Sequence, residues 1–188
     1  MPALQHFSLV GGTALALKYG HRISIDLDLF SHIPFDNNEI IADLASEFGD
    51  EFSLQFNREK FGIFCYINEI KVDIIKHPFI LLQDVELLEG LRIYHTTDIV
   101  AMKVNAILGR GKKKDFWDIF ELLHHYSLPD IIQFYYDKFP DQQLIIGIPY
   151  ALTYFDDAEE SEDPISLKGQ TWPDVKKFIQ QKVSEFLR

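Results

Sequence analysis

Two aspartates separated by one residue stand out because hydrophobic residues surround them. Asp26 and Asp28 alternate with Ile25, Leu27 and Leu29 in the stretch RISIDLDLF. On a β-strand, residues i and i+2 project from the same face, about 6.5 Å apart along the chain. Two unpaired carboxylates this close repel each other, and a divalent cation with hard oxygen ligands removes the repulsion. The pattern therefore predicts that the pair binds Mg²⁺ or Mn²⁺.

A third aspartate has the same kind of setting. Asp73 lies between Val72 and Ile74 in the stretch KVDII. If its strand lies beside the strand of the first pair, three carboxylates meet in one small volume and could hold two metals for in-line phosphoryl transfer. Asp73 would then bind the second metal or act as a base. The alternative is a solvated strand face, which is the more frequent meaning of a lone D-x-D.

The sequence Gly11-Gly12-Thr13 lies between an apolar stretch and a segment of helical composition. Glycines allow the backbone to turn sharply and to approach a ligand closely. The N-terminus of the following helix would offer free N–H groups to phosphate oxygens, while Thr13 would cap the helix or bind a phosphate. The P-loop pattern G-x-x-x-x-G-K-[ST] does not occur in the sequence. The motif is thus either a phosphate-binding turn or a tight turn only.

Periodicity and helix or turn signals indicate the elements that must position these residues. Strands are expected over residues 6–12, 22–31, 52–57, 61–68 and 70–77, the last three as an antiparallel meander. Helices are expected over residues 13–20, 36–49, 96–111, 114–127, 129–139, 142–155 and 172–187, with an exposed acidic loop at 156–164. The result is an α+β layout, with an α/β lobe over residues 1–95 and a helical lobe over 96–188 in one compact unit.

Composition narrows the classes of protein. The chain has 188 residues, 47% of them hydrophobic, and a formal net charge of −11, which argues against a generally basic nucleic-acid-binding surface. The basic run RGKKK at 110–114 is the obvious place for a polyanion to dock. A single cysteine, Cys65, excludes a disulfide framework and a cysteine-based zinc site. Without an apolar run of membrane-spanning length or a signal-like N-terminal segment, a cytoplasmic protein is expected.

Together, the glycine turn, the D-x-D strand and the later aspartate strand resemble the polymerase-β-like nucleotidyltransferase superfamily. The stretch GGTALALKYGHRISIDLDLF is similar, more narrowly, to the AbiEii/AbiGii-type nucleotidyltransferases, the toxins of type IV toxin–antitoxin and abortive-infection systems. The stretch TTDIVAMKVNAILGRGKKKDFWDIFELL continues the resemblance, which covers most of residues 7–125. It implies a mixed sheet with flanking helices, followed by a C-terminal helical lobe.

The resemblance also implies roles for individual residues. Metal binding and catalysis are implied for Asp26, Asp28 and Asp73, and nucleotide binding for Gly11, Gly12, Thr13, Lys103 and Asp118, with Lys103 also catalytic. The residues alone leave alternatives open. Lys103 could simply extend to solvent. Asp115 and Asp118 share a helix face and could pair with basic side chains, and we favour a structural role for Asp115 and a site role for Asp118.

The function implied is a Mg²⁺-dependent nucleotidyltransferase that moves a nucleoside monophosphate from an NTP to RNA, such as a tRNA end, or to a protein hydroxyl. Its expected partners are the NTP, that acceptor and a cognate antitoxin protein, with no membrane. The alternative is a non-catalytic module that binds a nucleotide or a partner protein. A D-x-D glycosyltransferase would leave the glycine turn unexplained. The loop residues His21 and Arg22 either contact phosphate or, as we favour, order the loop.

Overall fold

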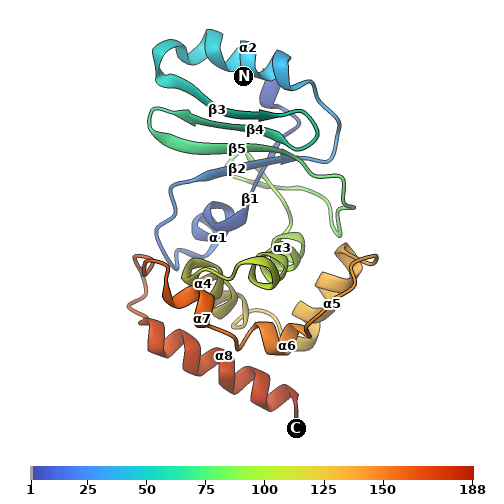
Figure 1. Ribbon diagram of the computed structural model, residues 1–188, viewed down its shortest axis with the longest axis vertical. Coiled ribbons are helices and arrows are strands. Elements are labelled where there is room, and N and C mark those ends of the chain that lie inside the picture. Colours follow the sequence, from blue (N-terminus) through green and yellow to red (C-terminus); the bar gives the residue numbers. More distant parts are fainter. Residues whose placement is uncertain (1) are drawn as a thin grey trace.

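The computed structural model describes residues 2–188 and contains a mixed seven-stranded sheet. The order of its strands is β3-β4-β5-β2-β1-β7-β6 (Figure 1). The strands are β1 (Ser8–Val10), β2 (Leu27–Ser31), β3 (Phe52–Arg58), β4 (Gly62–Ile67), β5 (Ile70–Lys76), β6 (Glu86–Leu88) and β7 (Leu91–Ile93). All of them precede residue 96, and the expected meander is present because β3, β4 and β5 pair antiparallel.

In Figure 1, α2 (Asn37–Phe48) lies above β3, and the remaining α-helices, which include all those of the C-terminal half of the chain, lie below β2. They are α1 (Gly11–Tyr19), α3 (Thr96–Gly109), α4 (Lys113–Leu122), α5 (Leu128–Lys138), α6 (Ile148–Ala151), α7 (Asp156–Glu159) and α8 (Trp172–Phe186). Two 3-10 turns, η1 (Pro2–Leu4) and η2 (Gly49–Glu51), complete the elements. Within residues 2–188, no helix has both the length and the apolar character needed to cross a membrane.

Strands β2 and β5 run parallel, and this pairing brings two of the predicted carboxylates together. Asp28 on β2 is the register partner of Asp73 on β5. The other edge of β2 pairs antiparallel with β1, which leads directly into α1. The chain therefore brings the glycine turn and both aspartates to one end of adjacent strands, as the sequence predicted.

Two hydrophobic cores hold these elements in place. Helix α2 packs Ile40 and Leu44 against Ile63, Cys65 and Ile74 of the sheet. Burial raises the pKa of the Cys65 thiol to about 11, which fits a small core side chain rather than a reactive one. The second core joins β1 and α1 to α3, α4, α5 and α8, so the sheet and the C-terminal helices share one interior.

Strand β2 is shorter than the sequence predicted, because the start of the predicted strand forms backbone hydrogen bonds with another part of the chain instead of with the sheet. Ile23 N–H donates to the carbonyl of Ile165, and Leu167 N–H donates to the carbonyl of His21. Residues 21–23 are thus held by a C-terminal segment that no local pattern identifies. Asp26 consequently lies before β2, outside the regular alternation of the strand.

Three further expectations differ from the structure. The helix predicted over 142–155 is reduced to α6, which begins after Gly147 and has Pro149 in its first turn. The acidic stretch 156–164 starts with the short helix α7 rather than forming a loop throughout. The hairpin of β6 and β7 escaped prediction because each strand has only three residues.

Candidate active site

The glycine turn brings the backbone directly against the carboxylate of Asp28. Gly11 is the first residue of α1 and has φ +71°, a left-handed conformation that disfavours residues with a Cβ. A Cβ placed on Gly11 would lie 2.5 Å from Asp28 Oδ2. Asp28 therefore faces the bend at the start of α1, and only glycine permits this approach.

Replacing Gly11 with alanine tests this close approach. The methyl group would displace the Asp28 carboxylate, and the left-handed backbone would add strain of about 1–3 kcal/mol. We expect Gly11→Ala to lower the thermal midpoint by a few degrees and to reduce nucleotidyl transfer more than that loss explains. Gly109→Ala is the matched control, since no atom lies within 4 Å of a Cβ there. Equal effects of the two substitutions on transfer would contradict the assignment.

Asp28 and Asp73 form a pair of neighbouring carboxylates that lacks a full set of partners. Asp73 Oδ2 accepts a hydrogen bond from Lys71 Nζ, whereas Asp73 Oδ1 is buried without a partner. Burial raises the pKa of Asp28 and the Asp73 charge adds to the rise, while Lys103 opposes it. A divalent cation would supply the missing partner and offset the repulsion, so the donor set fits Mg²⁺ or Mn²⁺.

Asp26 does not join this pair in the structure. Its side chain is 46% exposed and its Oδ2 lies 3.5 Å from Lys114 Nζ. Among the described residues, no group of three or more Asp, Glu, His or Cys side chains is gathered closely enough to hold a metal. The predicted three-carboxylate cage is therefore not assembled. The alternation used to predict it fails at Asp26, which precedes β2.

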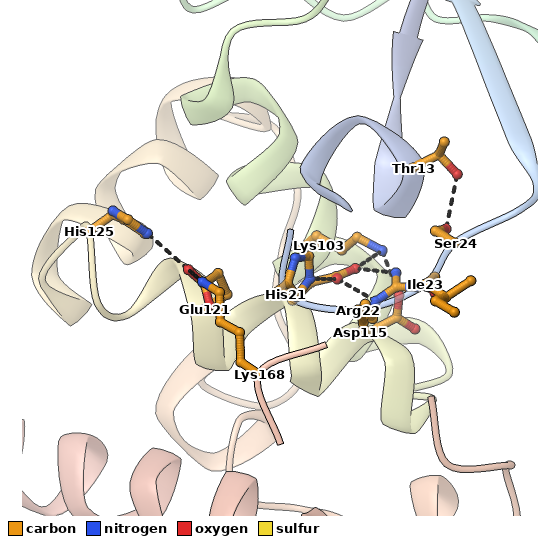
Figure 2. A network of polar contacts seen from close by, with 11 residues as sticks. Thr13, His21, Arg22, Ile23, Ser24, Lys103, Asp115, Glu121, His125 and Lys168 are labelled. Carbon is orange, nitrogen blue, oxygen red and sulfur yellow. Dashed lines mark hydrogen bonds and ion pairs between the residues drawn. The ribbon is translucent and has the colours of Figure 1, made fainter. Parts of the chain in front are cut away.

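Thr13 connects the glycine turn to the segment before β2. Its side chain is buried, and its hydroxyl donates to the carbonyl of Asp26 and lies 2.9 Å from Ser24 Oγ (Figure 2). The hydroxyl is thus already engaged within the protein. The backbone N–H groups at the start of α1 are what the turn can offer a phosphate, since no side chain caps this helix.

Lys103 and Asp118 lie in a buried ionic network beneath the turn. Lys103 Nζ is 2.9 Å from Asp115 Oδ1 and 2.7 Å from Asp118 Oδ2. Asp118 is fully buried and accepts two hydrogen bonds from Arg22, at 2.7 and 2.9 Å, and its Oδ1 lies 2.7 Å from His21 Nε2 (Figure 2). Asp115 also accepts from the backbone N–H of Lys112 in a capping box, the structural role favoured from the sequence.

This network lies behind the glycine turn rather than in open space. Asp118 is buried, but the charge of Lys103, its hydrogen bonds with His21 and Arg22 and the charge of Arg22 keep its pKa well below the usual range. Lys103 and Asp118 contact other side chains in the structure, and at the turn the charge of Lys103 also opposes the rise in the pKa of Asp28 that burial causes. The nucleotide contacts predicted for them remain predictions.

Arg22 is the residue whose importance the sequence did not reveal. A Cβ on Gly12 would lie 2.1 Å from Arg22 Nη2, so the guanidinium rests against the turn. The sequence signal was its place between the helix ending at Gly20 and the D-x-D stretch. The sequence could not show that Arg22 contacts Asp118, because the two residues are 96 positions apart in the chain. In the structure, Asp118 fixes the guanidinium in a two-point contact.

A cavity of about 520 Å³ adjoins this site on the side of Asp26. Its walls are residues 22–26, Lys112, Lys114 and residues 160–165. The basic run therefore contributes two lysines to a space beside the carboxylates. Lys113 instead pairs with Asp163 at 2.7 Å, so the run is partly neutralised by the acidic stretch.

Comparisons with known proteins agree on the kind of protein this is. Residues 2–168 match the family described as nucleotidyl transferase AbiEii toxin, type IV TA system. The uncharacterized protein aq_aa25 of Aquifex aeolicus is 33% identical, over 96% of this chain and 88% of its own.

The fold is also found in solved structures of other proteins. The nucleotidyltransferase toxin MenT4 of Mycobacterium tuberculosis H37Rv has a TM-score of 0.62 at 14% identity, with 96% of this chain and 76% of MenT4 covered. JHP933 of Helicobacter pylori has a TM-score of 0.55 at 17% identity, with 98% and 87% covered. At these identities the likeness concerns the fold alone, and the family assignment comes from the sequence match over residues 2–168. The chain belongs to the AbiEii family of nucleotidyl transferase toxins of type IV toxin–antitoxin systems.

Proposed function

We propose that this chain transfers a nucleoside monophosphate from an NTP to a hydroxyl group, with Asp28 at the centre of the site. The observation that carries the proposal is the contact between Asp28 Oδ2 and the Gly11 turn, with Asp73 as the register partner of Asp28. A phosphate chain bound at the start of α1 would thus lie against carboxylates. Such contact is unfavourable unless cations lie between the two sets of oxygens.

The divalent cation belongs to this proposal. Asp28 and Asp73 would hold it, and Asp26 would join them by leaving Lys114, since a 3.5 Å pair between exposed side chains stabilises little. When bound, the cation supplies charge neutralisation at the phosphates and a more acidic acceptor hydroxyl. Lys114, released from Asp26, would then be available to the triphosphate in the neighbouring cavity.

The transfer step breaks one bond and forms one. The acceptor oxygen attacks the α-phosphorus, the bond from that phosphorus to the bridging oxygen breaks, and pyrophosphate leaves. Because Oδ1 of Asp73 would be occupied by the cation, the proton of the attacking hydroxyl is released to solvent. Arg22, fixed by Asp118 against Gly12, holds positive charge near the phosphates as negative charge develops there.

The acceptor and the partners follow from the family. We propose RNA, with a tRNA end as one case, because the resemblance to the AbiEii/AbiGii-type toxins implies it. The cavity beside Asp26 carries Lys112 and Lys114 but also Glu160, Glu162 and Asp163, so its charge alone does not select a polyanion. A protein hydroxyl is the other acceptor to be tested. As a member of a toxin family, the chain would be controlled in the cytoplasm by a cognate antitoxin.

Transfer can be measured directly with the intact chain. Each of the four NTPs, labelled at the α-phosphate, is incubated with the protein and total RNA or total protein in Mg²⁺, Mn²⁺ or EDTA. We expect label to enter RNA from at least one NTP with either metal, and none in EDTA. Label that appears equally in EDTA, or in no acceptor under any metal, would contradict the proposed activity.

A further inference from the structure

A row of side chains crosses four strands of the sheet and begins at the proposed catalytic carboxylates. Asp28 on β2 pairs with Asp73 on β5, Asp73 pairs with Phe64 on β4, and Phe64 pairs with Phe56 on β3. Register partners project from the same face of a sheet. The row therefore leads from the site to the β3 edge, and neighbouring strands are about 4.8 Å apart.

The face that carries this row is the one that α2 leaves open. Helix α2 packs on Ile63, Cys65 and Ile74, which alternate with Phe64 and Asp73 along their strands. Phe64 is therefore on the opposite face from α2. Phe56 is 52% exposed there, so its ring is accessible to a binding partner.

An irregularity in β3 places Phe56 on this face. Leu54 pairs with Cys65, and Phe56 pairs with Phe64. The register thus moves by two residues along β3 but by only one along β4, which is a β-bulge. Without this bulge, Leu54 and Phe56 would share a face, and Phe56 would turn toward the side of α2. Bulges of this kind re-aim a side chain and occur frequently at sheet edges and beside active sites.

A cationic side chain completes the row. The guanidinium of Arg58 lies 5.8 Å from the ring centroid of Phe56 and 5.8 Å from that of Phe64. Arg58 is exposed, so its charge is open to solvent beside the two rings. Two aromatic faces with an arginine, continuous with carboxylates, make a surface on which unpaired bases can stack while the arginine attracts phosphates.

We propose that Phe56, Phe64 and Arg58 form a stacking platform for the single-stranded end of a nucleic-acid acceptor. The last nucleotide would lie at Asp28 and Asp73, and the bases before it would stack on Phe64 and then Phe56. This inference rests on the proposed function, which it deepens by assigning the acceptor a single-stranded end with accessible bases. The platform residues position the acceptor and do not touch the reacting atoms.

Binding of a 12-nucleotide single-stranded RNA of mixed sequence, labelled with fluorescein and followed by anisotropy without NTP, tests the platform. We expect Phe56→Ala to weaken binding about 5- to 100-fold, the effect of one lost stacking contact, and Phe56→Tyr to bind like the wild type. Arg58→Ala should weaken binding and lower its salt dependence. Leu54→Ala is the matched control, because Leu54 is 43% exposed on the same strand and faces the other way.

Several outcomes would overturn the platform. The first is an equal loss of RNA affinity in Phe56→Ala and Leu54→Ala, and the second is a wild type that does not bind the RNA. The third is a Phe56→Ala variant that loses affinity for NTP, measured by calorimetry, rather than for RNA. A Phe56→Ala variant that loses labelling of a protein acceptor but keeps RNA binding would assign the surface to protein instead. The readout is independent of catalysis. If the protein binds RNA through Phe56 but transfers no nucleotide, only the proposed activity is contradicted. If it transfers nucleotides to RNA and Phe56→Ala has no effect on RNA binding, only the platform is contradicted.

Discussion

Replacing Asp118 with asparagine is expected to destabilise the protein by about 3–5 kcal/mol, because it breaks a buried ion pair on one side only. Arg22 and Lys103 both donate to Asp118 from positions that are less than one-tenth exposed. Asparagine keeps the shape but turns an N–H₂ group toward one of these donors. For a chain of this size the thermal midpoint should fall by about 6–20 °C.

Denaturant titration measures this loss, and Asp137→Asn is the control because Asp137 is exposed on α5. The pH dependence gives a second test. The pKa of Asp118 is lowered in the folded state from its usual 3.8, so its stabilisation is complete above that value and is lost as pH falls below it. The difference between wild type and Asp118→Asn should therefore shrink below about pH 4. A difference that stays constant there would assign the loss to packing rather than to charge.

Asp28→Asn is expected to reduce nucleotidyl transfer by about 10³-fold or more with the fold intact. Asparagine removes the charge that faces the Gly11 turn and leaves Asp73 without a neighbouring carboxylate. The loss corresponds to about 4 kcal/mol, within what a metal-binding group contributes to the transition state. Because burial raises the pKa of Asp28, the variant should be at least as stable as the wild type near neutral pH.

Initial rates with the labelled NTP measure this effect, alongside a thermal melt of the same samples. Asp43→Asn, on the exposed side of α2, is the control for loss of one negative charge. NTP binding in Mg²⁺ should weaken in Asp28→Asn and be unchanged in Asp43→Asn. Transfer that survives in Asp28→Asn at a tenth of the wild-type rate or more would remove Asp28 from the centre of the mechanism.

Local patterns were sufficient for the parts of the site that lie within one element. The alternation around Asp28 and Asp73 predicted two strands, and Gly20 ended α1 as predicted, whereas α1 begins at Gly11, two residues before its predicted start. The resemblance to nucleotidyltransferases then predicted that these strands would be neighbours, as the β2–β5 pairing shows. Each of these inferences depended on residues close together in the sequence or on a shared motif.

Long-range contacts decided the parts that were not predicted. Alternation extended the D-x-D strand back to Arg22, but residues 21–23 pair with 165–167, and this left Asp26 outside the strand and the carboxylate cage unassembled. Asp118 holds Arg22 in the interior, a contact that was not predicted beside its expected role at the nucleotide. In both cases the deciding partner is far away in sequence, so no periodicity could reveal it.

The pairing of residues 21–23 with 165–167 also has a consequence for biosynthesis. The glycine turn, β2 and β5 all precede residue 96, whereas the segment 165–167 that pairs with residues 21–23 is synthesised later. A nascent polypeptide that ends before residue 165 thus lacks the backbone partners of residues 21–23, although it already contains Asp118, which holds the guanidinium. The loop that carries Arg22 therefore gains its last backbone partners only after the sheet and α4 have been synthesised.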